Sequence, residues 1–69
     1  MPMYHTRTEV RDEYELLAEY QDDIDADSAT QARADAHRFA LDEVPPQMQN
    51  HVTINVVECE EVPDESERG

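Results

Sequence analysis

The sequence predicts a small α+β domain in which one helix packs on a three-stranded sheet, in the order β-β-α-β. Two stretches, residues 1–10 and 51–59, alternate side chains with the period of two that strands show. Between them, residues 29–44 repeat small apolar side chains at helical spacing. A chain of 69 residues has room for one domain only. We expect residues 1–62 to form it and residues 63–69 to be a flexible, disordered acidic tail.

The first predicted strand covers residues 1–10. Its two faces differ, with Tyr4, Thr6, Thr8 and Val10 on one and His5, Arg7, Glu9 and Arg11 on the other. A strand with one polar face suits the edge of a sheet, so we expect an edge strand here. The pair Asp12-Glu13 indicates a polar break after it.

Residues 14–20 decide the fold, because two periodicities fit them. With a period of two, one face carries Tyr14, Leu16, Ala18 and Tyr20, as in a half-buried strand. With a period of 3.6, a helical stripe is formed by Val10, Tyr14, Leu17 and Ile24, and Thr6-x-x-Glu9 is a possible capping box. We favour the strand, because residues 25–31 have the chemistry of a junction between a strand and a helix. The helical alternative stays open.

The helix over residues 29–44 is the best-defined element. Asp27 or Ser28 can accept the free N–H groups of its first turn, and Ser28-x-x-Gln31 matches a capping box. Its apolar face consists of Ala29, Ala32, Ala36, Phe39, Ala40 and Val44. Because most of these are alanines, the helix can lie close to the sheet with Phe39 as its main wedge. The pair Pro45-Pro46 ends the helix at Val44.

The last predicted strand covers residues 51–59, where Val52, Ile54 and Val56 share one face. The doublet Val56-Val57 breaks the alternation and indicates a bulge or a second covered face. The predicted core consists of Tyr14, Leu16, Ala18, Tyr20, Ala32, Ala36, Phe39, Ala40, Val52, Ile54 and Val56.

The charge balance is the most informative part of the composition. Eighteen Asp and Glu oppose five Arg, lysine is absent, and the formal charge is −13. Such a surface is typical of proteins from salt-loving archaea, since a Debye length of about 3 Å at molar salt removes most self-repulsion. We therefore expect a protein of a halophilic archaeon or of one of its viruses. The alternative is a GC-rich genome, which favours Arg codons, together with an ordinary acidic surface.

Neither a membrane span nor a secretion signal is indicated by the sequence. No run approaches the roughly 20 apolar residues of a span, and the N-terminal residues lack a basic region and an apolar stretch. We expect a cytoplasmic protein that does not contact a membrane. Cys59 is the sole cysteine, which excludes a disulfide within one chain.

The usual ligands of zinc are scattered along the chain, at His5, His37, His51 and Cys59. Zinc sites need close pairs such as Cys-x-x-Cys, and none is present. The carboxylates of residues 22–27 lack the glycine and glutamate that a calcium-binding loop places at fixed positions. We expect no metal site.

Catalytic signatures are missing as well. Gly69 is the only glycine, so no glycine-rich loop can cradle a phosphate. No local signature of a nucleophile surrounds Ser28, Ser66 or Cys59. We expect no cofactor and no enzymatic activity.

Electrostatics disfavour direct nucleic-acid binding, so we expect none, and they favour a protein partner. Affinity for phosphates comes largely from Lys and Arg, which are too few here to form a basic face. Acidic side chains could instead attract a basic partner. The candidate acidic interaction surface consists of Glu13, Glu15, Glu19, Asp22, Asp23, Asp25 and Asp27.

The expected function is that of a non-catalytic interaction or accessory protein with a salt-adapted surface. The alternative is an inhibitor that mimics nucleic acid, because alternate strand residues lie about 6.6 Å apart. A row of acids at that spacing has a charge density of the order of one DNA strand, with a charge per roughly 3.4 Å. Mimicry requires acids concentrated on one face, whereas salt adaptation scatters them.

The second face of the sheet predicts self-association. By the alternation, Leu17 and Val57 lie on this face, which the single helix leaves open. Symmetric dimers are the commonest way to cover such a face and an exposed strand edge. We expect a homodimer that strengthens as salt rises, since two highly acidic chains repel each other in dilute buffer.

Overall fold

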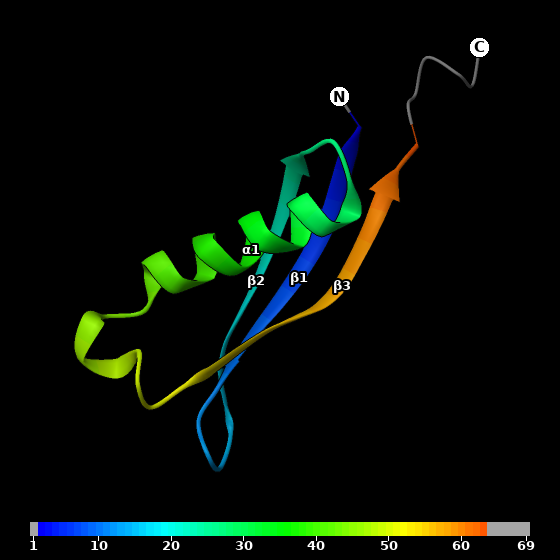
Figure 1. Cartoon of the computed structure of the whole chain (residues 1–69). Coiled ribbons are helices and arrows are strands. Elements are labelled where there is room, and N and C mark those ends of the chain that lie inside the picture. The colour runs from blue at the N-terminus through cyan, green and yellow to red at the C-terminus, as the bar shows by residue number, and fades with distance from the viewer. Residues whose placement is uncertain (1, 64–69) are drawn as a thin grey trace.

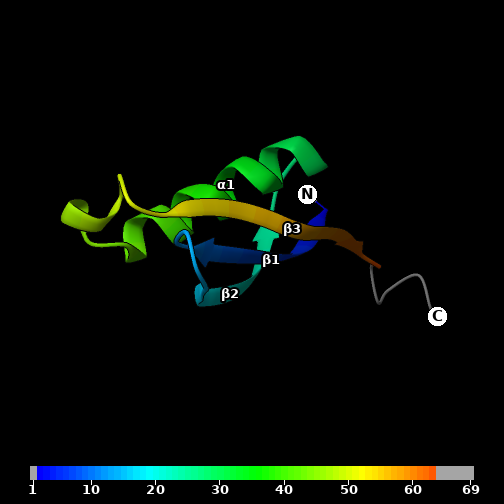
Figure 2. The same cartoon turned by 90° about the horizontal axis from the view of Figure 1, so that it is seen from below.

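The computed structural model describes residues 2–63 and has the predicted β-β-α-β order (Figure 1). Its elements are β1 (Met3–Arg11), β2 (Leu16–Asp25), α1 (Ala29–Glu43), the short 3-10 helix η1 (Pro46–Met48) and β3 (Thr53–Val62). Figures 1 and 2 show α1 crossing one face of the sheet diagonally and leaving the other face open. The predicted tail begins at Pro63, and residues 64–69 lie outside the described residues.

The sheet has the order β2-β1-β3, and β1 is antiparallel to both neighbours. β1 is therefore the central strand, and the prediction of an edge strand for residues 1–10 is wrong. Tyr4, Thr6, Thr8 and Val10 are all buried beneath α1. The polar residues between them cover the open face of the sheet. Alternation identifies a strand with one wet face, but it does not say how many neighbours the strand has.

The hairpin between β1 and β2 depends on Asp12. Its carboxylate accepts the backbone N–H groups of Tyr14 at 2.7 Å and Glu15 at 2.8 Å. These two donors hold the pKa of Asp12 below its ordinary range, against the opposing effect of burial. Because of this turn, the second strand begins at Leu16. From there to Asp25 the strand interpretation is confirmed, and the helical alternative is wrong.

The helix begins as the sequence predicts. Ser28 is the N-cap, and its hydroxyl accepts the backbone N–H of Gln31 at 3.2 Å. Only this half of the capping box forms, because the Gln31 side chain donates to Asp35 instead. Val44 is the C-cap, and the prolines that follow prevent another turn.

The core is more polar than predicted. Ala32, Ala36 and Ala40 are buried and let α1 approach the sheet closely. The other buried residues are Tyr4, Thr6, Thr8, Val10, Ile24, Ala26 and Val44. The predicted core residues Ala18, Tyr20, Val52, Ile54 and Val56 are partly buried and pack at the margins of this core.

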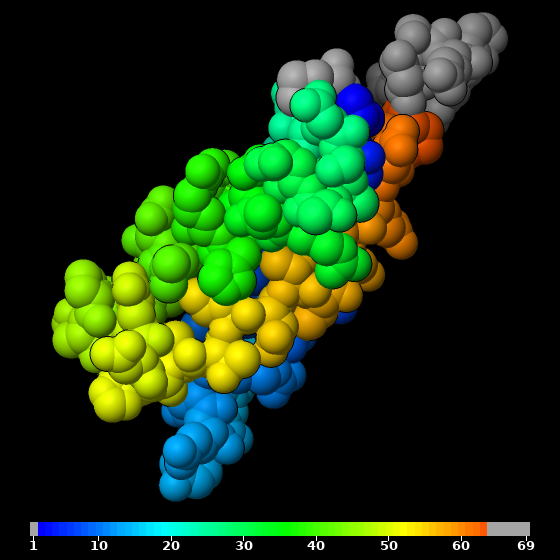
Figure 3. Space-filling model, in the orientation of Figure 1, coloured from blue at the N-terminus to red at the C-terminus, as the bar shows by residue number. Residues whose placement is uncertain are grey.

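Three predicted core residues are exposed instead, namely Tyr14, Leu16 and Phe39. Tyr14 is 89% exposed because it lies in the hairpin turn, which projects beyond the body of the molecule (Figure 3). Leu16 is at the start of β2, where the register shift places it opposite Arg11 on the open face. Phe39 precedes Ala40 and is rotated away from the alanine stripe, with the Arg38 guanidinium 5.7 Å from the centre of its ring.

Both edge strands contain a register shift. In β3, the partner of Thr8 is Val56 and the partner of Arg7 is Glu58, so Val57 is an extra residue. This is the bulge indicated by the valine doublet, and it returns Cys59 to the helix-covered face. In β2, a similar shift leaves Leu17 as the extra residue.

Candidate interaction surface

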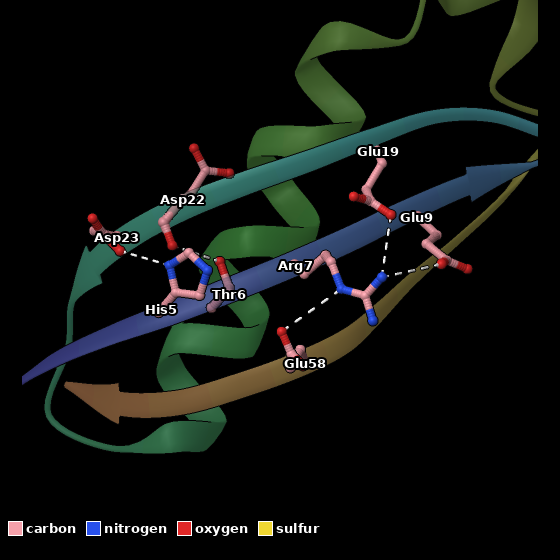
Figure 4. A network of polar contacts seen from close by, with 8 residues as sticks. All are labelled: His5, Thr6, Arg7, Glu9, Glu19, Asp22, Asp23 and Glu58. Atoms are coloured by element: carbon pink, nitrogen blue, oxygen red, sulfur yellow. Dashed lines mark hydrogen bonds and ion pairs between the residues drawn. The ribbon is translucent and has the colours of Figure 1, made fainter.

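The open face of the sheet is polar on all three strands except at its two ends, where Met3 lies opposite Val62 and Leu16 lies opposite Arg11. β1 contributes His5, Arg7, Glu9 and Arg11; β2 contributes Glu19, Gln21 and Asp23; and β3 contributes Asn55, Glu58 and Glu60. The residues with positive or titratable nitrogen lie on the central strand, and carboxylates lie on both flanks. Figure 4 shows part of this arrangement from the side opposite α1.

Arg7 connects the three strands (Figure 4). Its Nη1 lies 3.2 Å from Oε2 of Glu19 on β2 and 3.8 Å from Oε2 of Glu9 on β1. Its Nε lies 3.7 Å from Oε2 of Glu58 on β3. The Arg7 side chain is 34% exposed, so water and salt reach these pairs and weaken each of them. The main effect of Arg7 is thus to reduce the repulsion among three carboxylates, because none of its individual ion pairs is strong.

A second cross-strand pair joins His5 to Asp23. Nδ1 of the imidazole lies 2.8 Å from Oδ1 of the carboxylate. This hydrogen bond raises the pKa of His5 above its ordinary value, with further help from the negative charges of Glu58 and Glu60. At one end of the face, Nε of Arg11 lies 3.0 Å from Oε1 of Glu9. The cations of this face are therefore already engaged by carboxylates of the same chain.

The seven predicted acidic residues all lie on β2 or at its two ends, but they do not form one row. Glu13 and Glu15 are exposed in the hairpin turn, and Asp27 is exposed just before α1. Glu19, Asp23 and Asp25 share the open face, whereas Asp22 is on the helix-covered face and half-buried. The structure therefore brings the seven together along one edge of the sheet and divides them between its faces.

Carboxylates also cover the rest of the molecule. They are found on β3 at Glu58, Glu60 and Glu61, and on α1 at Asp35, Asp42 and Glu43. Only Asp35 among these helix residues has an ion pair within residues 2–63, with Arg38 at 3.3 Å. Acids thus occur on both edge strands, on the open face and on the helix.

The predicted self-association residues lie on opposite edges of the sheet. Leu17 is the extra residue of β2 and Val57 is the extra residue of β3, with β1 between the two strands. Their exposures are similar, 43% and 42%. Each lies at an irregularity, where the alternation used to assign its face is interrupted.

An apolar groove lies between β2 and the end of α1. Its volume is about 140 Å³, and it is lined by Val10, Leu17, Ala18, Tyr20, Glu43, Val44, Pro45, Met48 and Val52. Sequence reasoning did not find this groove, because its walls come from four separate segments. The one local signal is Met48, an apolar residue in a loop that is otherwise polar.

A larger and more polar hollow of about 510 Å³ lies at the hairpin end, lined by Asp12, Glu13, Tyr14, Asn50, His51, Val52 and Thr53. Across residues 2–63, His, Cys, Asp and Glu side chains do not gather in threes that could hold a metal ion. Cys59 is half-buried, and its thiol lies 3.8 Å from the carbonyl oxygen of Ala29. No helix in the part of the chain that the structure describes has the length and apolar character to cross a membrane.

The chain matches no protein-family model, and no curated protein or solved structure is significantly similar to it.

Proposed function

We propose that this chain is a non-catalytic accessory protein that binds another protein and whose surface is adapted to high salt. It would work in the cytoplasm of a halophilic archaeon, either as a protein of the cell or of one of its viruses. The observation that supports this proposal is the distribution of carboxylates over the hairpin, both edge strands, the open face and the helix. Salt adaptation scatters acids in this way.

The ion pairs point in the same direction. Most acids among residues 2–63 have no cationic partner there, and Glu13, Asp25 and Asp42 are examples. In dilute buffer these charges repel one another and favour expansion of the chain. At molar salt the Debye length of about 3 Å is shorter than most separations between them. The folded state should therefore gain stability as salt rises.

Urea unfolding followed by circular dichroism tests this expectation at about 50 mM and about 3 M KCl, where the Debye lengths differ severalfold. The urea midpoint should be clearly higher at the higher concentration. The triple variant Glu13→Gln, Asp25→Asn, Asp42→Asn should be more stable than the native chain at low salt and should respond less to added salt. Equal midpoints for the native chain at both concentrations would remove the argument for salt adaptation.

A nucleic-acid mimic is the second candidate, because seven acidic residues lie on one strand, the edge strand β2, or at its two ends. Such an inhibitor should displace DNA from a basic DNA-binding protein at physiological salt. The displacement should be lost when Glu15 and Glu19 are both replaced by Gln. Displacement that disappears at about 0.15 M salt, where the Debye length is about 8 Å, would indicate non-specific attraction only.

A further inference from the structure

The two free edges of the sheet differ in how well they are protected. On β3, the bulge at Val57 interrupts the strand. Arg33 reaches from α1 and donates from Nη1 to the backbone carbonyl of Val56 at 3.3 Å. A bulge and a covering side chain are two of the ways in which proteins prevent a strand edge from pairing. The edge of β3 is thus obstructed in the middle.

The edge of β2 has no such interruption over most of its length. Pairing with β1 is continuous from Ala18, opposite Val10, to Asp25, opposite Met3. This stretch contains neither proline nor glycine. Within residues 2–63, the stretch from Ala18 to Asp25 has no backbone hydrogen bond to any segment other than β1.

The direction of the backbone groups on β2 follows from one hydrogen bond. The Thr6 hydroxyl donates to the carbonyl oxygen of Asp22 at 3.1 Å, so this carbonyl points toward β1 (Figure 4). In an antiparallel ladder, successive residues direct their backbone groups to opposite sides. The N–H and C=O groups of Glu19, Gln21 and Asp23 therefore point away from the sheet, and they form a row of unpaired donors and acceptors.

The two faces that meet at this edge have different chemistry. On the open face, the side chains of Glu19, Asp23 and Asp25 are acidic. On the helix-covered face, Tyr20 and Leu17 border the apolar groove beside Met48. Side chains opposite one another on neighbouring strands are about 5 Å apart. An added strand would thus place its alternate side chains against carboxylates on the open face. On the other face it would meet apolar groups at the groove end of β2, with Asp22 as the one carboxylate there between Ala18 and Asp25.

We propose that β2 binds an extended segment of another protein as a fourth strand, and that this segment alternates basic and apolar residues. The inference rests on the proposed function and specifies how the partner is held. Main-chain hydrogen bonds to Glu19, Gln21 and Asp23 provide the attachment, and the two faces provide the selectivity.

Charge distinguishes this partner from a second copy of the chain. Two β2 strands paired antiparallel about Gln21 would place Glu19 of each copy opposite Asp23 of the other. Like charges directly opposite each other destabilise a strand pair, whereas opposite charges stabilise it. The same carboxylates that oppose pairing between copies attract a basic strand.

A synthetic peptide of about ten residues, the length of a long strand, tests the proposal. In it Lys and Val alternate, and the ends are acetylated and amidated. The control peptide has the same composition with all Lys first and all Val last. Hydrogen exchange of backbone amides is followed by NMR at about 0.15 M salt, where the Debye length is about 8 Å. The alternating peptide should slow exchange at Glu19, Gln21 and Asp23 by about tenfold or more, corresponding to about 1.4 kcal/mol. The block peptide should not.

Two substitutions at one position separate strand addition from attraction by charge. Gln21→Pro removes an N–H that points to solvent, at an edge position where proline is tolerated. Gln21→Thr keeps the N–H and suits a strand. The dissociation constant for the alternating peptide should rise about tenfold or more with proline, a loss of about 1.4 kcal/mol, and stay within about twofold with threonine. If the proline variant does not fold, the hydrogen-exchange experiment on the native chain with the two peptides tests strand addition by itself.

Three results would each overturn the proposal: equal protection by the block peptide, protection confined to β3, or protection of β2 in the free protein that grows with protein concentration. The last result would mean that β2 pairs with a second copy. A negative peptide experiment together with a salt-dependent urea midpoint would reject strand addition and leave the proposed function standing.

Discussion

At the scale of single residues, Thr6 and Thr8 are a matched pair in the middle of β1. Both are completely buried beneath α1, at 0% exposure. Thr6 donates its hydroxyl to the carbonyl of Asp22, whereas the Thr8 hydroxyl has no hydrogen-bond partner among the described residues. A buried polar group without a partner costs about 1 to 3 kcal/mol. Thr8 thus weakens the core without an evident local compensation.

Replacing each threonine by valine, which has nearly the same shape, should therefore have different results. Thr8→Val should raise the free energy of unfolding by about 1 kcal/mol or more, because it removes an unsatisfied hydroxyl. Thr6→Val should leave it unchanged or lower it by about 1 kcal/mol, because it removes a hydrogen bond. Urea unfolding at one fixed salt concentration measures both. A loss of stability in Thr8→Val as large as in Thr6→Val would show that the Thr8 hydroxyl is satisfied.

Asp12 predicts a pH dependence of the hairpin. Its pKa is lowered in the folded state by the N–H groups of Tyr14 and Glu15. A lowered pKa contributes stability above the ordinary value of about 3.9, and this contribution is lost as the pH falls through the folded-state value. Asn at this position keeps an acceptor oxygen but cannot titrate. The stability difference between the native chain and Asp12→Asn should therefore shrink below about pH 4. Urea midpoints from pH 7 down to about 2.5, which spans that range, measure it, and a constant difference would contradict the assignment.

At the scale of elements, Arg7 joins the three strands through carboxylates on each of them. Replacing it with Met keeps much of the side-chain length and removes the charge, leaving Glu9, Glu19 and Glu58 without their shared cation. Arg7→Met should lower the free energy of unfolding by about 1 kcal/mol at low salt, the upper end for exposed pairs. Molar salt should remove most of the loss, since it screens the remaining repulsion. Arg38→Met, which loses the local pair with Asp35 and the exposed contact with the Phe39 ring, is the control and should change little. A loss that salt does not reduce would indicate a packing role for Arg7.

The elements also show how far the sequence predicts this fold. Periodicity identified the helix and the first and last strands, and it gave the bulge at Val57 as one of two interpretations, because each depends on neighbouring residues. It left residues 14–20 ambiguous, and the chemistry of the junction at residues 25–31 favoured the strand. It did not place β1 at the centre, since strand order depends on which partners lie on either side. It assigned Phe39 to the core because Phe39 lies close to the buried alanines on the helix surface. A small rotation of the helix about its axis determines whether Phe39 faces the sheet or solvent, and the pattern does not specify that rotation. The apolar groove could not be predicted from the sequence, because Val10, Tyr20 and Met48 come together only in the folded chain.

At the scale of the whole molecule, the positions of Leu17 and Val57 allow the predicted self-association to be tested at each residue separately. A symmetric dimer uses the same patch on both copies. Because the two residues lie on opposite edge strands, a contact made through one edge of the sheet contains only one of them. Leu17 is the stronger candidate, since it lies in β2 beside the exposed Leu16 and borders the groove with Met48. Val57 is followed by Glu58 and lies on the obstructed edge.

We expect monomers of 8.0 kDa in dilute buffer and dimers at multimolar salt, because salt screens the repulsion between two chains that each carry a formal charge of −13. Light scattering at tens of micromolar protein measures the mass. Leu17→Ser should abolish the dimer, and the matched substitution Val57→Ser should leave it intact. If both substitutions abolish association, the interface extends from one edge of the sheet to the other and is not confined to the Leu17 end of β2. A mass near 8.0 kDa at every salt concentration would mean that the apolar end of β2 stays exposed and that the predicted dimer does not form.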